Sequence, residues 1–153
     1  MFCSLINKNP QLIPPNEYTA LRFDKESTDS AGWHITNDLS DPDSALIIPD
    51  ITDVGLLAAL VFWAPSDATQ YLHRFSRDPY GAIDSTATND RVPTIGQDFH
   101  VFTWPMMVRD GQPLALMVAH NASVPVAVNL CEFKVWIPRW KGFLLLSETP
   151  RDA

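Results

Sequence analysis

The prolines constrain the fold of this chain more than any other feature. The 153 residues include 13 prolines spread along the sequence, and proline interrupts a helix because it lacks a backbone N–H and clashes with the preceding turn. A mainly helical fold would therefore be reduced to short pieces. The segments between the prolines alternate apolar and polar side chains, which is the period of a half-buried β-strand. We expect an all-β protein.

Composition narrows the class further. Hydrophobic residues make up 46% of the chain and charged residues 19%, enough apolar surface for a folded domain. The formal charge is −7, and the sequence has no basic stripe of the kind that nucleic-acid binders carry. No apolar run approaches the roughly 20 residues of a membrane helix. We therefore expect neither a nucleic-acid partner nor a membrane partner.

The two cysteines, Cys3 and Cys131, form neither a disulfide framework nor a CxxC metal motif. Two reduced thiols are typical of a protein made and kept in a cytoplasm-like environment. We expect synthesis in a host cytoplasm.

Short strand-like segments recur along the chain between turn sequences. Residues 55–63 are apolar on both faces, which predicts a strand covered on both sides. Arg109-Asp110-Gly111 predicts a hairpin turn. About eight strands at such spacing indicate an antiparallel sandwich or jelly roll, with a small β-barrel as the alternative. The other predicted strands are residues 18–23, 45–48, 70–77, 99–104, 114–120 and 124–137, the last with Ala127, Cys131, Phe133, Val135 and Ile137 on one face.

Few residues form a pattern that could carry chemistry. The four histidines stand in separate segments without a metal-binding pair, and we expect them to be satisfied polar groups at a sheet surface or a subunit contact. No nucleophile elbow or phosphate-binding glycine loop is present in the sequence. Two acidic groups could supply a hydrolase pair or calcium ligands, but both are typical of solvated turns: Asp24, Glu26 and Asp29, and Asp38, Asp41 and Asp43. We expect no enzyme activity, cofactor or metal.

Several segments taken in order resemble one family. These are Gln11-Leu-Ile-Pro14, Tyr18-Thr-Ala-Leu-Arg-Phe-Asp24, the Gly32-Trp33-His34 turn, the run from Gly55 to Ala64, and Val108 to Asn121. Together they resemble the C1q/TNF-like jelly rolls common in bacteriophage virion proteins, over residues 10–138. The chain departs from the family pattern at Ile51-Thr-Asp-Val-Gly55, where a tight turn is usual, and after Pro138. The resemblance implies an antiparallel jelly-roll sandwich at residues 17–138, between an N-terminal arm (1–16) and a C-terminal tail (139–153).

The resemblance also implies a homotrimer whose axis is lined by apolar strand faces. The two-sided apolar run at residues 55–63 supports this independently, because association would bury the face that a small sandwich leaves open. Loops of the same subunit are the alternative cover. We expect the trimer interface to include Leu57, Leu60, Phe62, Phe102, Trp104 and Leu116.

The two ends of the chain are unusually apolar. They either fold back on their own subunit or dock on a neighbouring protein, where each large side chain would contribute roughly 1.5–3 kcal/mol. The candidate capsid contacts in these arms are Phe2, Leu5, Ile6, Trp140, Phe143, Leu144, Leu145 and Leu146.

These patterns lead to one functional expectation and one alternative. We expect a structural phage protein at the capsid surface of the virion, a trimeric cement or decoration protein whose partner is the major capsid protein or another virion protein. Three copies of each arm would combine weak contacts through their effective concentration. The alternative is a receptor- or glycan-binding head of a tail fibre or spike, with Trp33, Tyr71, Tyr80 and Trp104 as candidate residues for stacking on sugars.

Overall fold

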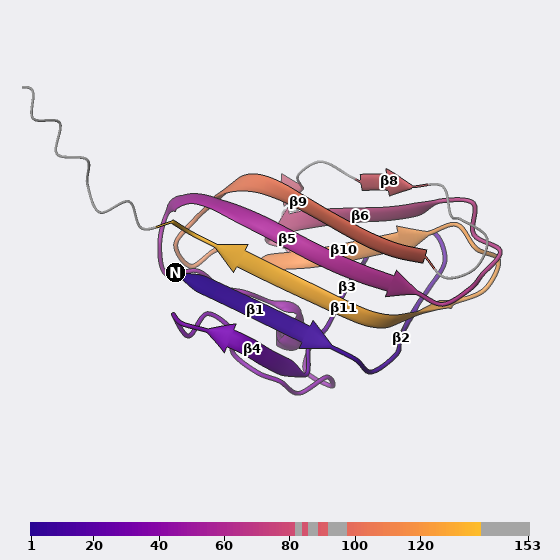
Figure 1. The fold of residues 1–153 in the computed structure, drawn as a ribbon, viewed down its shortest axis with the longest axis horizontal. Helices are drawn as coiled ribbons and strands as arrows, with labels where there is room; N and C mark the ends of the chain where they lie inside the picture. The colour runs from indigo at the N-terminus through magenta and orange to yellow at the C-terminus, as the bar shows by residue number, and fades with distance from the viewer. Residues whose placement is uncertain (82–83, 86–88, 92–97, 139–153) are drawn as a thin grey trace, which may run out of the picture.

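Two antiparallel β-sheets pack face to face in the computed structural model, which describes residues 1–81, 84–85, 89–91 and 98–138 (Figure 1). One sheet, here the β5 sheet, has the strand order β4-β1-β11-β5-β9, with β2 also paired to β11. The other, the β10 sheet, has the order β3-β10-β6-β7, with β8 also paired to β6. The predicted all-β jelly roll is confirmed. In the β5 sheet the strands are β1 (Phe2–Asn7), β2 (Gln11–Ile13), β4 (Lys25–Asp29), β5 (Asp53–Trp63), β9 (Asp98–Val108) and β11 (Val126–Trp136); in the β10 sheet they are β3 (Thr19–Ala20), β6 (Tyr71–Arg77), β7 (Asp84–Ser85), β8 (Asn89–Arg91) and β10 (Leu114–His120).

The core lies between the sheets and follows the two-residue period of the strands. Along β5 the odd-numbered side chains face inward, and Leu57, Val61 and Trp63 are fully buried. Leu116 and Val118 of β10 meet them from the other sheet. Burying each such side chain contributes roughly 1.5–3 kcal/mol, so the inward halves of β5 and β10 fix how the two sheets stack.

The N-terminal residues form part of this core instead of an arm. Strand β1 pairs with β11 on one side and with β4 on the other, and its Cys3 and Leu5 side chains are fully buried. The predicted arm at residues 1–16 is therefore wrong, because alternate apolar residues of this segment face the sandwich. Leu5 is not available to a capsid, while Phe2 and Ile6 are half-buried on the opposite side of the strand.

The predicted hairpin at residues 109–111 is a crossing between the sheets. Strand β9 pairs with β5, whereas β10 pairs with β3 and β6. Gly111 adopts a φ of 69°, which favours glycine, and its N–H donates to the Pro49 carbonyl at 2.8 Å. A turn forms at the predicted residues, but the strand that follows it belongs to the other sheet.

The last strand also departs from the predicted pattern at one point. A bulge in the β11–β5 register lies between Val128 and Leu130, and a bulge shifts the alternation of side chains by one residue. Val126 and Val128 are therefore buried, while Ala127 is only half-buried. Beyond the bulge, the predicted face of Cys131, Phe133, Val135 and Ile137 is confirmed as buried.

Two predicted strands, residues 18–23 and 45–48, are mostly irregular and run along the edge of β10, with side chains on both faces of the β10 sheet. Only Thr19–Ala20 forms a strand in the first, and a short 3-10 helix, η1 (Pro42–Ala45), begins the second. Leu46 packs against Ala115 and Met117 on the side of β10 away from the core. Strand β10 is consequently buried on both faces.

Candidate assembly surface

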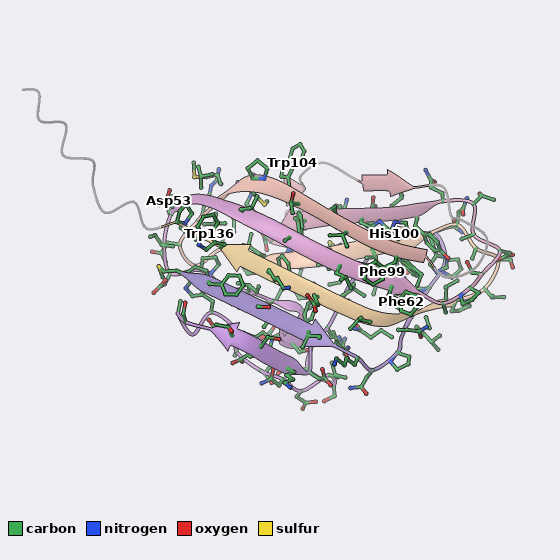
Figure 2. All side chains as sticks on the ribbon, in the orientation of Figure 1. Asp53, Phe62, Phe99, His100, Trp104 and Trp136 are labelled. Carbon is green, nitrogen blue, oxygen red and sulfur yellow. The ribbon has the colours of Figure 1, made fainter. Side chains whose placement is uncertain are left out.

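The side of the β5 sheet that faces away from the core carries a continuous row of apolar side chains. Because residues paired across antiparallel strands lie on the same side of a sheet, the register identifies them. Phe62 of β5 is opposite Phe99 of β9 and Leu130 of β11, and Leu60 is opposite Val101. Figure 2 shows Phe62, Phe99 and Trp136 on this side. We call it the outer β5 face, made of Val54, Leu56, Leu60, Phe62, Phe99, Val101, Met107, Leu130 and Trp136.

Most of these side chains are substantially exposed. Phe99 and Val101 each retain 56% of their surface, and Trp136 retains 48%. The rings of Phe62 and Phe99 pack against each other with centroids 5.9 Å apart, so the centre of the face is already ordered in one chain. A monomer rarely exposes a large contiguous apolar patch, and such patches mark interaction surfaces.

The charges on this face balance one another. Lys134 Nζ and Glu132 Oε2 of β11 form an ion pair at 2.6 Å, and both residues lie opposite outer-face positions of β5. Phe2 and Ile6 of β1 extend the apolar row, because they are opposite Trp136 and Glu132. The next strand, β4, is exposed and polar. The apolar area therefore extends from β4 on one side to β9, the last strand of the described sheet, on the other.

The six residues predicted for a trimer interface divide between the core and this face. Leu57 and Leu116 are fully buried between the sheets, so they are not accessible to a second copy and that part of the prediction is wrong. Phe102 also points inward, with its ring 5.0 Å from that of Phe75. Leu60 and Phe62 are half-buried on the outer β5 face. Trp104 is 43% exposed at the β9 edge (Figure 2).

Sequence reasoning missed Phe99, Val101 and Trp136. Each alternates with an inward-facing residue of its own strand: His100 and Phe102 on β9, and Val135 on β11. That alternation was visible in the sequence, but the side that faces outward depends on the register, which the sequence did not settle. The predicted tail contacts Trp140, Phe143, Leu144, Leu145 and Leu146 lie outside the described residues.

The histidines lie inside the molecule and not at its surface. The indole Nε1–H of Trp63 donates to His73 Nε2 at 2.9 Å, and the rings of His73 and His100 have centroids 4.7 Å apart. His120 Nε2 donates to the Ile13 carbonyl at 2.8 Å. The prediction of sheet-surface histidines is wrong, because these strand positions face the core.

His34 is also buried. Its ring lies between Glu26 Oε1 at 3.0 Å and the Ser44 carbonyl at 3.2 Å. In the described part of the chain, no three histidine, cysteine, aspartate or glutamate residues are placed to hold a metal ion.

The acidic groups considered for chemistry mainly organise turns. Asp29 accepts hydrogen bonds from the backbone N–H groups of Ala31 and His34. Hydrogen bonds from the hydroxyl and backbone N–H of Ser40 lower the pKa of Asp38. Asp41 caps η1 by accepting from the backbone N–H of Asp43. These contacts give Asp29, Asp38 and Asp41 a structural role.

Both cysteines are free and buried. Burial raises the pKa of the Cys3 thiol and of the Cys131 thiol far above the ordinary value. Inert protonated thiols are therefore expected at neutral pH. Among the described residues, no helix combines the length and the apolar character that crossing a bilayer requires.

Comparison with known proteins identifies the type of fold but finds no close relative in sequence. No protein-family model matches the sequence, and no curated protein matches it either. Solved structures do resemble it. The globular domain of zebrafish complement 1qA protein aligns with a TM-score of 0.60 at 9% identity, covering 89% of this chain and 95% of that one.

Two further solved structures align similarly. Murine APRIL at pH 5.0 gives a TM-score of 0.62 at 10% identity, over 90% of this chain and 100% of its own. Eiger TNF from S. frugiperda gives 0.54 at 10% identity, over 90% and 93%. At these identities the likeness concerns the fold alone, and it shows that this chain has a jelly roll of the C1q/TNF type.

Proposed function

We propose that this chain is a non-enzymatic structural protein that assembles as a homotrimer through the outer β5 face. The observation that carries the proposal is the exposure of aromatic and aliphatic side chains in register across β11, β5 and β9. A second copy is a fitting occupant, because the face is apolar and its one ion pair leaves it without net charge. The C1q/TNF type of fold favours three copies over two.

Side-chain burial sets the scale of this association. Fully burying a large apolar side chain contributes roughly 1.5–3 kcal/mol, and the outer-face residues are already about half-buried. Each therefore adds only part of that amount, while association costs about 4–15 kcal/mol of lost freedom. Several residues must be covered together, so one charge within the face is expected to prevent assembly.

Light scattering tests the assembly directly. The wild-type chain should have about three times the 17.1 kDa mass of one subunit. Val101→Asp should give a folded monomer, because Val101 is an exposed residue of the outer β5 face and lies opposite Leu60. Val124→Asp is the matched control, since Val124 has nearly the same exposure but lies in a turn. A wild-type monomer at micromolar concentration would contradict the proposal.

We further propose that the trimer decorates a bacteriophage capsid. The support is the order of sequence segments that resembles phage virion jelly rolls, together with the multivalency of three copies. Deleting Trp140–Ala153 should abolish co-sedimentation with purified capsids while leaving the trimer intact. Capsid binding that survives the deletion would contradict a role for this tail.

A further inference from the structure

A groove of about 660 Å³ lies on the opposite side of the molecule from the outer β5 face. Its floor includes Met117 of β10 and Arg74 of β6, which are paired in register on the side of the β10 sheet away from the core. Its walls come from residues 10–13, 17–20 and 22 and from Leu39, Pro42, Pro79 and Tyr80. Pockets of 300–1,000 Å³ are typical of small-molecule sites, so the groove has the size for one or two sugar rings.

Arg74 is held in the groove by an aromatic ring and not by an acid. Its guanidinium carbon lies 3.7 Å from the centroid of the Tyr18 ring, and Nη2 donates only to the Met117 sulfur, at 3.8 Å. Its Nε is buried without a hydrogen-bond partner among the described residues. Stacking on Tyr18 therefore orients a planar cation whose other donors are not occupied by a carboxylate, and such a fork matches a carboxylate in two parallel hydrogen bonds.

Arg22 adds a second cation to the same groove. Its Nη1 donates to the Leu39 carbonyl at 2.7 Å, and within the described parts of the chain it makes no ion pair either. Two arginines therefore line one groove in a chain whose formal charge is −7.

Tyr80 supplies a ring face at the mouth of the groove. The side chain is 57% exposed, and its hydroxyl is fixed by donating to the Pro42 carbonyl at 3.0 Å. Burial raises the pKa of Tyr80, and the nearby Asp43 and Asp41 act in the same direction while Arg22 opposes them. The ring is therefore neutral and held in place for stacking.

Acidic side chains at the groove restrict the kind of ligand that it can bind. Glu17 lines it, and Asp41 and Asp43 lie close enough to Tyr80 to influence its hydroxyl. These carboxylates would repel a ligand that is anionic all over, such as an acidic peptide. They would accept hydrogen bonds from hydroxyl groups. The groove thus combines two cations, a ring face and hydroxyl acceptors.

We propose that this groove binds an acidic saccharide, with its carboxylate on Arg74 and Arg22, its ring on Tyr80 and its hydroxyls toward Glu17. The proposal does not depend on self-assembly, because the groove is built from one chain and lies on the other sheet. It gives the molecule two functional sides, one for copies of itself and one for a glycan.

A matched pair of ligands tests the proposal. Methyl β-D-glucuronide and methyl β-D-glucoside differ only in the carboxylate at C6, and both can be titrated into the full-length protein by NMR. The glucuronide should bind about tenfold more tightly, which is the effect expected of one charge-assisted hydrogen-bonded pair. Arg74→Gln should reduce the difference, because only Arg22 then remains to meet the carboxylate, and Tyr80→Ala should weaken both sugars by a similar factor.

Arg109→Gln is the control, since Arg109 is an exposed arginine in the turn between β9 and β10. It should bind both sugars as the wild type does. Equal wild-type affinities for the two sugars, an unchanged preference in Arg74→Gln, or the same loss in Arg109→Gln would each overturn the proposal. Tighter binding of acetylated tetraglutamate than of glucuronide would overturn it in favour of an acidic peptide site.

Discussion

The outer faces of the two sheets are covered in different ways. On the β10 sheet, Ala115 and Met117 point away from the core and are still buried, because Leu46 and Tyr18 of the same chain lie over them. On the β5 sheet, Val101 and Trp136 occupy equivalent outward positions and are about half exposed. The described part of the chain therefore covers the outer face of the β10 sheet and leaves the outer face of the β5 sheet exposed.

The cover arises from the path of the chain. Between β2 and β5, the chain pairs with the edge of β10 through the short strand β3 and the bridge residue Ile47. The neighbouring side chains of Tyr18, Ala20, Leu46 and Ile48 pack on the outer side of β10. The described segments around β5 provide no comparable layer on its outer side. This difference shows that apolar residues on two faces of a strand do not by themselves indicate a partner protein.

The largest expected effect is on the free energy of unfolding, and it appears when one residue from each outer face is replaced. Met117→Ala should lower the free energy of unfolding by about 2–5 kcal/mol, because it removes a side chain buried beneath the chain's own cover. Leu60→Ala should lower the unfolding free energy of the dilute subunit by less than about 1 kcal/mol while weakening assembly. Urea unfolding and light scattering separate the two effects. Equal destabilisation of the dilute subunit would mean that the outer β5 face is covered within one chain.

The fold was predictable where one strand carries a long, unambiguous pattern. The predicted strand at residues 55–63 is β5 (Asp53–Trp63), and residues 114–120 match β10. Residues 18–23 and 45–48 show the limit of such patterns. Their apolar side chains are buried, but Leu21 and Phe23 reach the core from an irregular segment, which periodicity cannot distinguish from a strand.

The interface prediction failed for a related reason. Leu57 and Leu60 both lie on β5 and are equally apolar, yet one faces the core and the other faces outward. A shift of one residue exchanges the two faces of a strand, and only the pairing with β9 and β11 resolves the choice. The groove beside Arg74 could not be found from sequence, because Tyr18 and Arg74 are brought together by the tertiary fold.

The ion pair between Lys134 and Glu132 on the outer β5 face tests whether the interface includes β11. If assembly covers β11, Lys134→Met should weaken it by about tenfold, because the Glu132 charge is then left without its partner. Glu132→Leu combined with Lys134→Met should restore assembly to at least the wild-type level, since both charges are gone. Sedimentation velocity measures the assembly of the single variant and of the double variant. An unchanged Lys134→Met variant, together with a disrupted Val101→Asp variant, would place the interface on β5 and β9 alone.

The last comparison concerns the inner side of the same sheet. Cys3 and Cys131 stay protonated in the folded chain because burial raises the pKa of each thiol, whereas in the unfolded chain they ionise near pH 8.5. The unfolded state therefore binds fewer protons above that pH, and stability falls as pH rises. At pH 9 the loss is about 0.8 kcal/mol per thiol relative to pH 7.

Urea unfolding at pH 7 and pH 9, compared with a Cys3→Ala/Cys131→Ala double variant, isolates this contribution. Other groups titrate equally in both proteins, so the difference between their pH slopes belongs to the thiols. The wild type should lose more stability than the variant over this range. Identical slopes would mean that the thiols are solvated in the folded chain, and the inner side of β1 and β11 would then be no drier than the outer β5 face that we assign to assembly.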